Sequence, residues 1–327
     1  MRRREFISFL TGAAVAGPGA AIAQTSSKVF RLGTLSPGAP VDEKSPLGAI
    51  LLQKLGQNGY TLGKNLEFEA RAAAGEMSRL GEIVRSMKAD KVDVIVVGGF
   101  PTTLACKVAN VPTVVYVGAG DPVATHLIDS LAHPGGDITG ISDNAAALAT
   151  KRLALIKQAV PNLRRVAMLW NRDDLGMSMR YEASAGAAGS LGVTVQALGV
   201  REPDDFNGVF EAMDREQPDA IFMVADALTT LNRRRVFDYA GAHHIPAMYE
   251  YDPNVHDGGL MSYGPDLKEC MERAADLVTR IFAGARPADL PFEEPTHYKL
   301  VINLKTAKAT GIELPPNFLA LADEVIE

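Results

Sequence analysis

The sequence is poor in cysteine, in tryptophan and in clustered basic residues. Its 327 residues contain only two cysteines and one tryptophan. Two cysteines as far apart as Cys106 and Cys270 exclude a disulfide-rich scaffold and a Cys-x-x-Cys redox pair. Acidic residues (39) outnumber basic ones (33), the net charge is −6, and no Lys/Arg run after the first four residues is longer than Arg233–Arg235. This balance argues against nucleic acid as a partner.

Motifs for nucleotide binding and for common catalytic sites are missing as well. Before Gly63-Lys64, Asn58 stands where a Walker A loop needs glycine. After Gly118 and Gly120, Val123 takes the place of the third glycine of a dinucleotide fingerprint. Neither a Gly-x-Ser-x-Gly nor a His-Glu-x-x-His motif occurs, and the six histidines show no metal-ligand spacing. We therefore expect no cofactor, no metal site and no enzymatic activity.

The N-terminal segment has the pattern of an export signal. Arg3 and Arg4 precede a modestly apolar stretch, a Gly-Pro-Gly break and the small-residue site Ala21-Ile22-Ala23. The arginine pair, followed after one residue by Phe6-Ile7, also fits the twin-arginine pattern. We predict a twin-arginine signal peptide over residues 1–23, cleaved near Ala23-Gln24, and a periplasmic protein. Beyond it, no apolar run is long enough to span a bilayer.

Short β-branched runs alternate with amphipathic helical periods along the rest of the chain. This alternation is typical of parallel sheets covered by helices. Several of the runs are apolar throughout, as expected of strands buried on both faces. The runs predicted to be strands are residues 29–35, 92–97, 111–117, 165–170, 220–224, 247–249 and 297–302.

The alternation restarts after a Pro-Gly-Gly break at 134–136, which divides the chain into two halves of domain size. We predict an α/β fold of two doubly wound parallel-sheet lobes, with a hinge and a central cleft. Lobe 1 is expected to comprise residues 29–141 plus about 252–291, and lobe 2 about 142–251 plus about 292–327. Ligands of open α/β sheets bind beyond the carboxyl ends of the strands, which here face the cleft.

A predicted helix start in lobe 1 is a candidate anion site. Gly99, Thr102 and Thr103 follow the strand run at 92–97, and Pro101 suits the first turn of a helix. The amides of a first helical turn are unpaired, so a carboxylate could bind there beside the hydroxyls. An ordinary helix start would show the same residues. Ser36, where the first strand run ends, is a further candidate.

Acidic and amide side chains follow other predicted strands. Asp121 precedes Pro122, and we favour a helix cap over a ligand contact for it. Asn171 and Asp226 follow two strand runs of lobe 2. Asp226 is the first candidate for a ligand ammonium group, although it could equally cap the helix that follows.

The segment Tyr249-Glu250-Tyr251 closes the strand run at 247–249. Alternation along a strand would place both tyrosines on one side, so we expect an aromatic face beside the ligand. Glu250 is the second candidate for the ammonium group. Cys106 and Cys270 could pair in an oxidising compartment, but Cys270 lies on an apolar helical stripe and is expected first in the core.

Several longer motifs, taken together, are specific to one family: Gly98–Thr103, Gly120-Asp121-Pro122-Val123, Lys151-Arg152-Leu153, Gly258–Gly264, Leu300–Ala307 and Ala322–Glu327. With them, the chain resembles over essentially its whole length the bacterial ABC-transporter solute-binding proteins of the tryptophan/tyrosine-transport type, a type I periplasmic-binding-protein family. The chain departs from the family's frequent Asn-Pro pair at Asn171-Arg172.

This resemblance implies a two-lobed protein that closes on a small solute and presents it to a permease. We expect the periplasmic component of an ABC importer, binding a small carboxylate-bearing solute (an amino acid or aromatic acid) without catalysis. We expect it to be a monomer whose partners are this small-molecule ligand and an ABC permease in the inner membrane. Two alternatives remain open. One is an exported α/β enzyme such as a hydrolase, with its acid and base drawn from Asp121, Asp226 or Glu250; the other is a binding protein that serves a sensor kinase.

Overall fold

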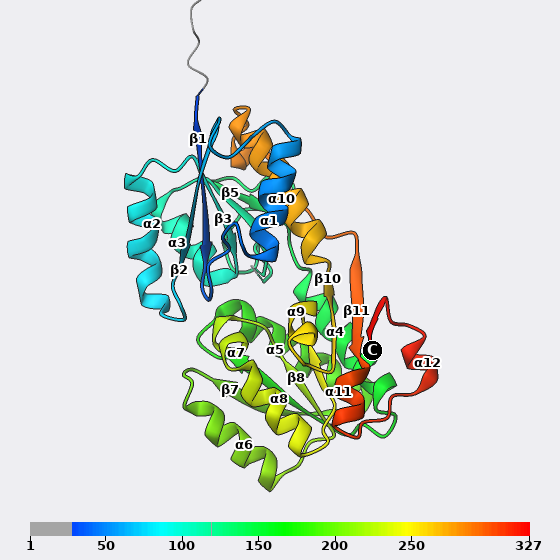
Figure 1. Ribbon diagram of the computed structural model, residues 1–327. Coiled ribbons are helices and arrows are strands. Elements are labelled where there is room, and N and C mark those ends of the chain that lie inside the picture. Colours follow the sequence, from blue (N-terminus) through cyan, green and yellow to red (C-terminus); the bar gives the residue numbers. More distant parts are fainter. Residues whose placement is uncertain (1–27, 119) are drawn as a thin grey trace, which may run out of the picture.

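Two lobes, each built on its own sheet, make up the chain (Figure 1). The computed structural model describes residues 28–118 and 120–327, so the predicted signal peptide lies outside the described residues. In that part of the chain, no helix combines the length and the apolar character needed to cross a membrane.

The first lobe is a five-stranded parallel sheet in the order β2-β1-β3-β4-β5. Its strands are β1 (Phe30–Ser36), β2 (Leu66–Ala72), β3 (Val94–Gly98), β4 (Thr113–Val117) and β5 (Ile138–Gly140). Its helices are α1 (Pro46–Gln57), α2 (Leu80–Ala89), α3 (Phe100–Ala109) and α10 (Leu267–Phe282).

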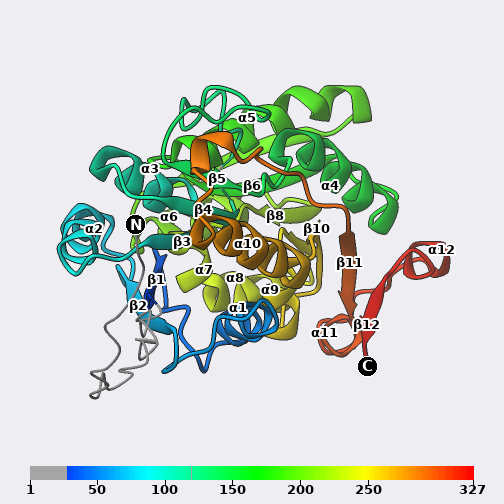
Figure 2. The same cartoon turned by 90° about the horizontal axis from the view of Figure 1, so that it is seen from above.

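Alternation along β3 shows why this sheet is covered on both faces. Val94 and Val96 pack with α1 and α10, whereas Ile95 and Val97 pack with α2 and α3. Figure 2, seen from above, shows α1 and α10 together on one side of the sheet. A strand buried on both faces must be apolar at every position, and this made β3 easy to predict from the sequence.

The second lobe is a seven-stranded sheet in the order β12-β11-β10-β9-β8-β6-β7, parallel except for the antiparallel pair β10–β11. Its strands are β6 (Arg165–Asn171), β7 (Thr194–Val200), β8 (Ala220–Met223), β9 (Ala247–Tyr249), β10 (Met261–Pro265), β11 (Tyr298–Asn303) and β12 (Glu324–Ile326). Its helices are α4 (Ala145–Ala159), α5 (Leu175–Ala188), α6 (Asp205–Arg215), α7 (Ala227–Leu231), α8 (Arg233–Ala242), α9 (Asp252–His256), α11 (Leu304–Ala309) and α12 (Pro316–Leu319).

Helices α4 and α5 cover one face of this second sheet, and α6 and α8 cover the other. Along β6, Val166 and Met168 pack on the α4–α5 side, while Ala167 and Leu169 pack on the α6–α8 side. The prediction of an α/β fold with two parallel-sheet lobes covered by helices is therefore confirmed, except that β10 and β11 pair antiparallel.

The predicted division of the chain between the lobes is wrong for residues 252–265. Strand β10 pairs with β9 and β11 of the second sheet, and α9 packs beside it. The chain crosses between the lobes after β5 near Ile141, after β10 at Pro265-Asp266, and again between Leu290 and β11. The expected crossing near Tyr251 does not occur. The prediction was wrong because sequence periodicity does not show which sheet a strand joins.

The strands that the sequence analysis missed lie mainly at sheet edges. Strands β2, β7 and β12 are edge strands, and β2 and β7 carry partly exposed side chains along most of their length. An edge strand lacks the continuous apolar run that marks a central one. The seven predicted runs coincide with β1, β3, β4, β6, β8, β9 and β11 to within two residues at either end.

The two cysteines are free and lie on opposite faces of the first sheet. Cys106 on α3 packs with the α2–α3 side, and Cys270 on α10 packs with the α1–α10 side. Burial raises the pKa of each thiol to about 12. The sheet between them rules out the disulfide that the sequence left open.

Candidate functional site

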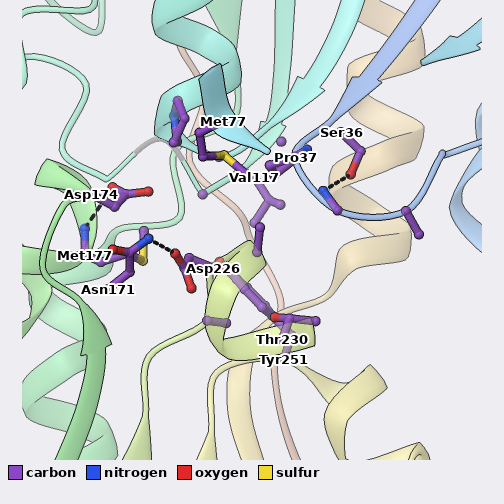
Figure 3. A pocket seen from close by; sticks show the side chains of 18 of the residues that line it. Ser36, Pro37, Met77, Val117, Asn171, Asp174, Met177, Asp226, Thr230 and Tyr251 are labelled. Atoms are coloured by element: carbon purple, nitrogen blue, oxygen red, sulfur yellow. Dashed lines mark hydrogen bonds between the residues drawn. The ribbon is translucent and has the colours of Figure 1, made fainter. Parts of the chain in front are cut away.

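A cavity of about 230 Å³ lies between the two lobes (Figure 3). It opens where strands of both sheets end, the position expected for a ligand in this class of fold. It continues past Met77 and Pro101 into a groove of about 800 Å³ that shares Asn171 and Asp174 with it. The described lining residues are Ser36, Pro37, Gly38, Ala39, Met77, Gly98, Gly99, Pro101, Tyr116, Val117 and Gly118 from the first lobe, and Asn171, Asp174, Met177, Ala225, Asp226, Ala227, Thr230 and Tyr251 from the second.

Asp226 is both a helix cap and a wall of the cavity. Its Oδ1 accepts the Thr229 amide at 2.8 Å, and the Thr229 hydroxyl in turn accepts the Asp226 amide, which completes a capping box at the start of α7. Its Oδ2 accepts a hydrogen bond from Asn171 Nδ2 at 2.6 Å. The helix-cap and ligand-contact interpretations of Asp226 are therefore compatible.

Asp174 is a second carboxylate in the same wall, one that sequence reasoning missed. It is the N-cap of α5, its Oδ1 accepts the Met177 amide at 3.2 Å, and it is only 4% exposed. Figure 3 shows it on the same side of the cavity as Asp226. Burial first, and then the nearby Asp226 charge, raise the pKa of Asp174 to about 6. The sequence pattern that could have identified it is an aspartate three residues beyond the end of β6, but the same pattern is typical of an ordinary helix cap.

Within the described residues, no lysine, arginine or histidine lines this cavity. The other polar side chains that line the cavity are the Asn171 amide and the hydroxyl groups of Ser36, Tyr116, Thr230 and Tyr251. No cluster of three or more potential metal ligands occurs anywhere in the described chain. The cavity therefore carries negative charge and neutral donors.

The helix start in lobe 1 lies at the cavity, but not in the way the sequence analysis expected. Gly99 lines the cavity as the N-cap of α3, with a φ of 89° that favours glycine. Thr102 and Thr103 are buried and do not line it. Their hydroxyls donate to the Gly98 and Gly99 carbonyls, the usual bonding of threonine inside a helix, so these side chains are not available to a ligand.

Of the Tyr249-Glu250-Tyr251 segment, only Tyr251 reaches the cavity. Strand β9 ends at Tyr249, whose ring packs edge-on against Phe237 in the core, 5.1 Å between centroids. Tyr251 is the N-cap of α9. The expectation that Tyr249 and Tyr251 share a face was wrong, because alternation holds only while the strand continues.

Glu250 is enclosed in a buried ion network beneath the cavity instead of facing a ligand. Its Oε1 accepts Arg152 Nη1 at 2.7 Å, and its Oε2 accepts both Arg180 and the Ala225 amide. Burial alone would raise the pKa of Glu250, but Arg180 and Arg152 hold it below its usual value. Its charge is already neutralised.

The same network reaches one crossover between the lobes. Arg180 also bonds to Asp143, which lies between β5 and α4, and the Tyr251 hydroxyl donates to Asp143 Oδ2 at 3.3 Å. Arg152 Nε donates to the Tyr263 carbonyl of β10 at 2.6 Å. The floor of the cavity is thus joined to a hinge segment through charge-assisted hydrogen bonds.

Asp121 lies outside the cavity. It is exposed, and its Oδ1 accepts the amides of Val123 and Ala124 at 3.0 Å each. These bonds close a turn and not a helix, since no α-helix begins there. Asp121 is therefore neither a ligand contact nor the helix cap that the sequence analysis favoured, although its carboxylate does accept two backbone amides.

Comparison with known proteins agrees with this architecture. The profile of the family described as ABC transporter substrate binding protein matches residues 49–326. A tyrosine-binding protein of Clostridioides difficile is 23% identical over 264 residues, covering 80% of this chain and 75% of that protein.

Two solved structures superpose on nearly the whole chain. A conserved domain protein from Vibrio cholerae matches with a TM-score of 0.84 at 25% identity, covering 91% of this chain and 100% of that one. An ABC domain in complex with L-Trp from Streptococcus pneumonia matches with a TM-score of 0.80 at 23% identity, covering 91% and 99%. The chain belongs to the ABC transporter substrate binding protein family and has the fold of the type I periplasmic binding proteins.

Proposed function

We propose that this protein is the periplasmic solute-binding component of an ABC importer and that it binds an amino acid, without catalysis, between its lobes. The observation that carries the proposal is the cavity itself, where the Asn171–Asp226 pair of one lobe lies across from Ser36 and Gly99 of the other. The matched family consists of transporter components, and two relatives are described as binding tyrosine or L-Trp.

Asp226 is the proposed contact of the ligand's ammonium group. A buried ammonium needs a carboxylate partner, and the Asp226 side chain is held in place by Asn171 and Thr229. The cavity and the adjoining groove, about 230 and 800 Å³, together leave room for an aromatic side chain. In this proposal the protein acts as a monomer, and an inner-membrane ABC permease receives the solute.

A hydrolase is poorly supported by the same geometry. Of the three carboxylates considered as acid or base, Asp121 lies outside the cavity and Glu250 is held by two arginines. Only Asp226 remains in the cavity, so the fold does not bring the three together.

A thermal-shift screen of the protein against the common amino acids tests this proposal. An amino acid present at 100 times its Kd should stabilise the folded state by about 2.7 kcal/mol. Uptake of the same radiolabelled amino acid should then fall in a strain lacking the protein. Absence of a shift with every amino acid would refute the ligand class. A normal uptake rate alongside strong binding would instead favour service to a sensor kinase.

A further inference from the structure

The cavity holds two carboxylates and, among its described lining residues, no basic side chain. Asp174 is 4% exposed, and no side-chain donor in the described chain bonds to its carboxylate. Asp226 shares one oxygen with Asn171 and the other with Thr229. One buried and one half-buried carboxylate favour a cation on the ligand, because a buried charge without a partner is costly.

The opposite wall offers little to a negatively charged group. The Gly99 amide already donates to the Val117 carbonyl, and the Gly38 amide donates to Ser36 Oγ at 3.2 Å. The Thr102 and Thr103 hydroxyls donate to backbone carbonyls. Within the cavity, what remains for a carboxylate is a set of neutral hydroxyls and backbone amides; the basic side chains Arg85 and Arg201 line the adjoining groove instead.

We propose that Asp174 is a specificity-determining residue which, together with Asp226, selects the ammonium group of the ligand, and that a carboxylate on the ligand is dispensable. The ligand class is then a primary amine with an apolar or aromatic body, of which an amino acid is one case. This inference rests on the proposed function, because it assigns the contacts of the same cavity.

Charge complementarity gives the reason. A zwitterionic amino acid brings no net charge to a cavity that carries two carboxylates, whereas the matching amine brings one positive charge. The carboxylate of the zwitterion would lie close to Asp174 and Asp226 and would be repelled by both. The amine that lacks this group avoids the repulsion.

The test is isothermal titration with two matched pairs, tryptophan with tryptamine and tyrosine with tyramine, and with indole-3-propionate as the acid that lacks an amine. We expect each amine to bind within tenfold of its amino acid or more tightly, and the acid to show no binding. Amines that bind more than tenfold more weakly than their amino acids would overturn this inference and leave the proposed function intact. Binding by the acid alone would overturn both. Binding by none of the five compounds would overturn this inference, and the screen against all common amino acids would then decide the proposed function.

Substitution of Asp174 by asparagine distinguishes a role in ligand selectivity from a role in folding. Asn is as good a helix N-cap as Asp, so Asp174→Asn should keep α5 intact and leave the melting temperature of the protein unchanged or higher. We expect it to weaken the best-binding amine at least tenfold. Asp289→Asn is the matched control: its side chain is 58% exposed, is paired with Arg286 and lines neither the cavity nor the groove, so binding should change less than twofold. Wild-type affinity of Asp174→Asn for the amine would show that Asp174 does not determine ligand specificity.

Discussion

Gly120 of the first lobe and Gly176 of the second meet across the cleft. A Cβ added to Gly120 would lie 3.1 Å from Gly176 Cα, and a Cβ added to Gly176 would lie 3.4 Å from Phe100 Cβ. Gly120 has a φ of +69°, which glycine tolerates, whereas Gly176 is in the first turn of α5 and needs no special φ. The lobes approach this closely because neither residue has a side chain.

A large side chain at position 176 should act as a wedge. Gly176→Leu should keep the lobes apart and weaken ligand binding at least tenfold, because the leucine would occupy the space taken by Phe100 and Gly120. Small-angle scattering should show a radius of gyration that no longer decreases when ligand is added. Gly186→Leu in the same helix is the control, since a Cβ there meets nothing within 4 Å. Equal ligand-induced compaction in both variants would contradict the wedge.

Removal of the Asp226 carboxylate should affect binding and folding separately. Asp226→Ala loses both the ammonium partner and the cap of α7, so binding of an amine-bearing ligand should weaken by about 3 kcal/mol or more. The melting temperature should also fall. Asp226→Asn retains a capping side chain, so it should weaken binding at a nearly normal melting temperature. Normal binding in both variants, measured by titration calorimetry, would leave Asp226 as a helix cap only.

Ligand affinity should depend on pH through Asp174. Its pKa is raised to about 6 by burial and by Asp226, while Arg180 and the amides of Met177 and Gly176 act in the opposite direction. Below pH 6 the ammonium must displace a proton from Asp174, so affinity should fall by up to about tenfold per pH unit. Titration at pH 7.5, 6 and 5 checks this, and Asp174→Asn should flatten the profile.

The raised pKa of Asp174 affects the stability of the ligand-free protein in the opposite sense: acid lowers the ligand affinity but favours the folded state. A carboxyl whose pKa is higher in the folded than in the unfolded state stabilises the fold below the unfolded value of 3.8. This contribution is lost as the pH rises through about 6. In the free protein, Asp174 should therefore make the free energy of unfolding larger at pH 5 than at pH 7. Urea unfolding without ligand should show that Asp174→Asn removes this contribution and so reduces the difference between the two pH values.

The buried network beneath the cavity should be important for stability. Glu250→Gln would leave Arg152 and Arg180 facing Asp143 alone, and we expect the free energy of unfolding to fall by about 3–5 kcal/mol. Urea unfolding measures this loss. Glu216→Gln is the control, because that side chain is 58% exposed in its pair with Arg165 and should cost less than about 1 kcal/mol.

Export should depend on the arginine pair near the N-terminus. Replacing Arg3 and Arg4 with lysine keeps the positive charge but changes the address that the twin-arginine receptor reads. Cell fractionation should then show the protein retained in the cytoplasm. Full recovery from the periplasm would instead indicate a general secretory signal.

The sequence by itself determined the fold class and the lobes' central strands. Strands such as β3 and β8 are apolar at every position because helices cover both faces of their sheets, and this pattern is local. Asn171 and Asp226 were found for a related reason: a polar residue at or shortly beyond the end of an apolar strand lies at the carboxyl edge of the sheet.

Only the tertiary structure decided which residues face the ligand. The sequence pattern indicates a helix cap at Asp174 and hydrogen-bond donors to a ligand at Thr102 and Thr103. In the structure, Asp174 lines the cavity, whereas Thr102 and Thr103 are buried and do not. Because strand β9 ends at Tyr249, Tyr249 lies in the core and Tyr251 at the cavity, and the two do not share a face as expected. Strand β10 joins the second sheet through pairing with β9 and β11. Such outcomes depend on contacts between segments far apart in the chain. Local propensity carries no information about them, because the burial of a side chain is set by what packs against it.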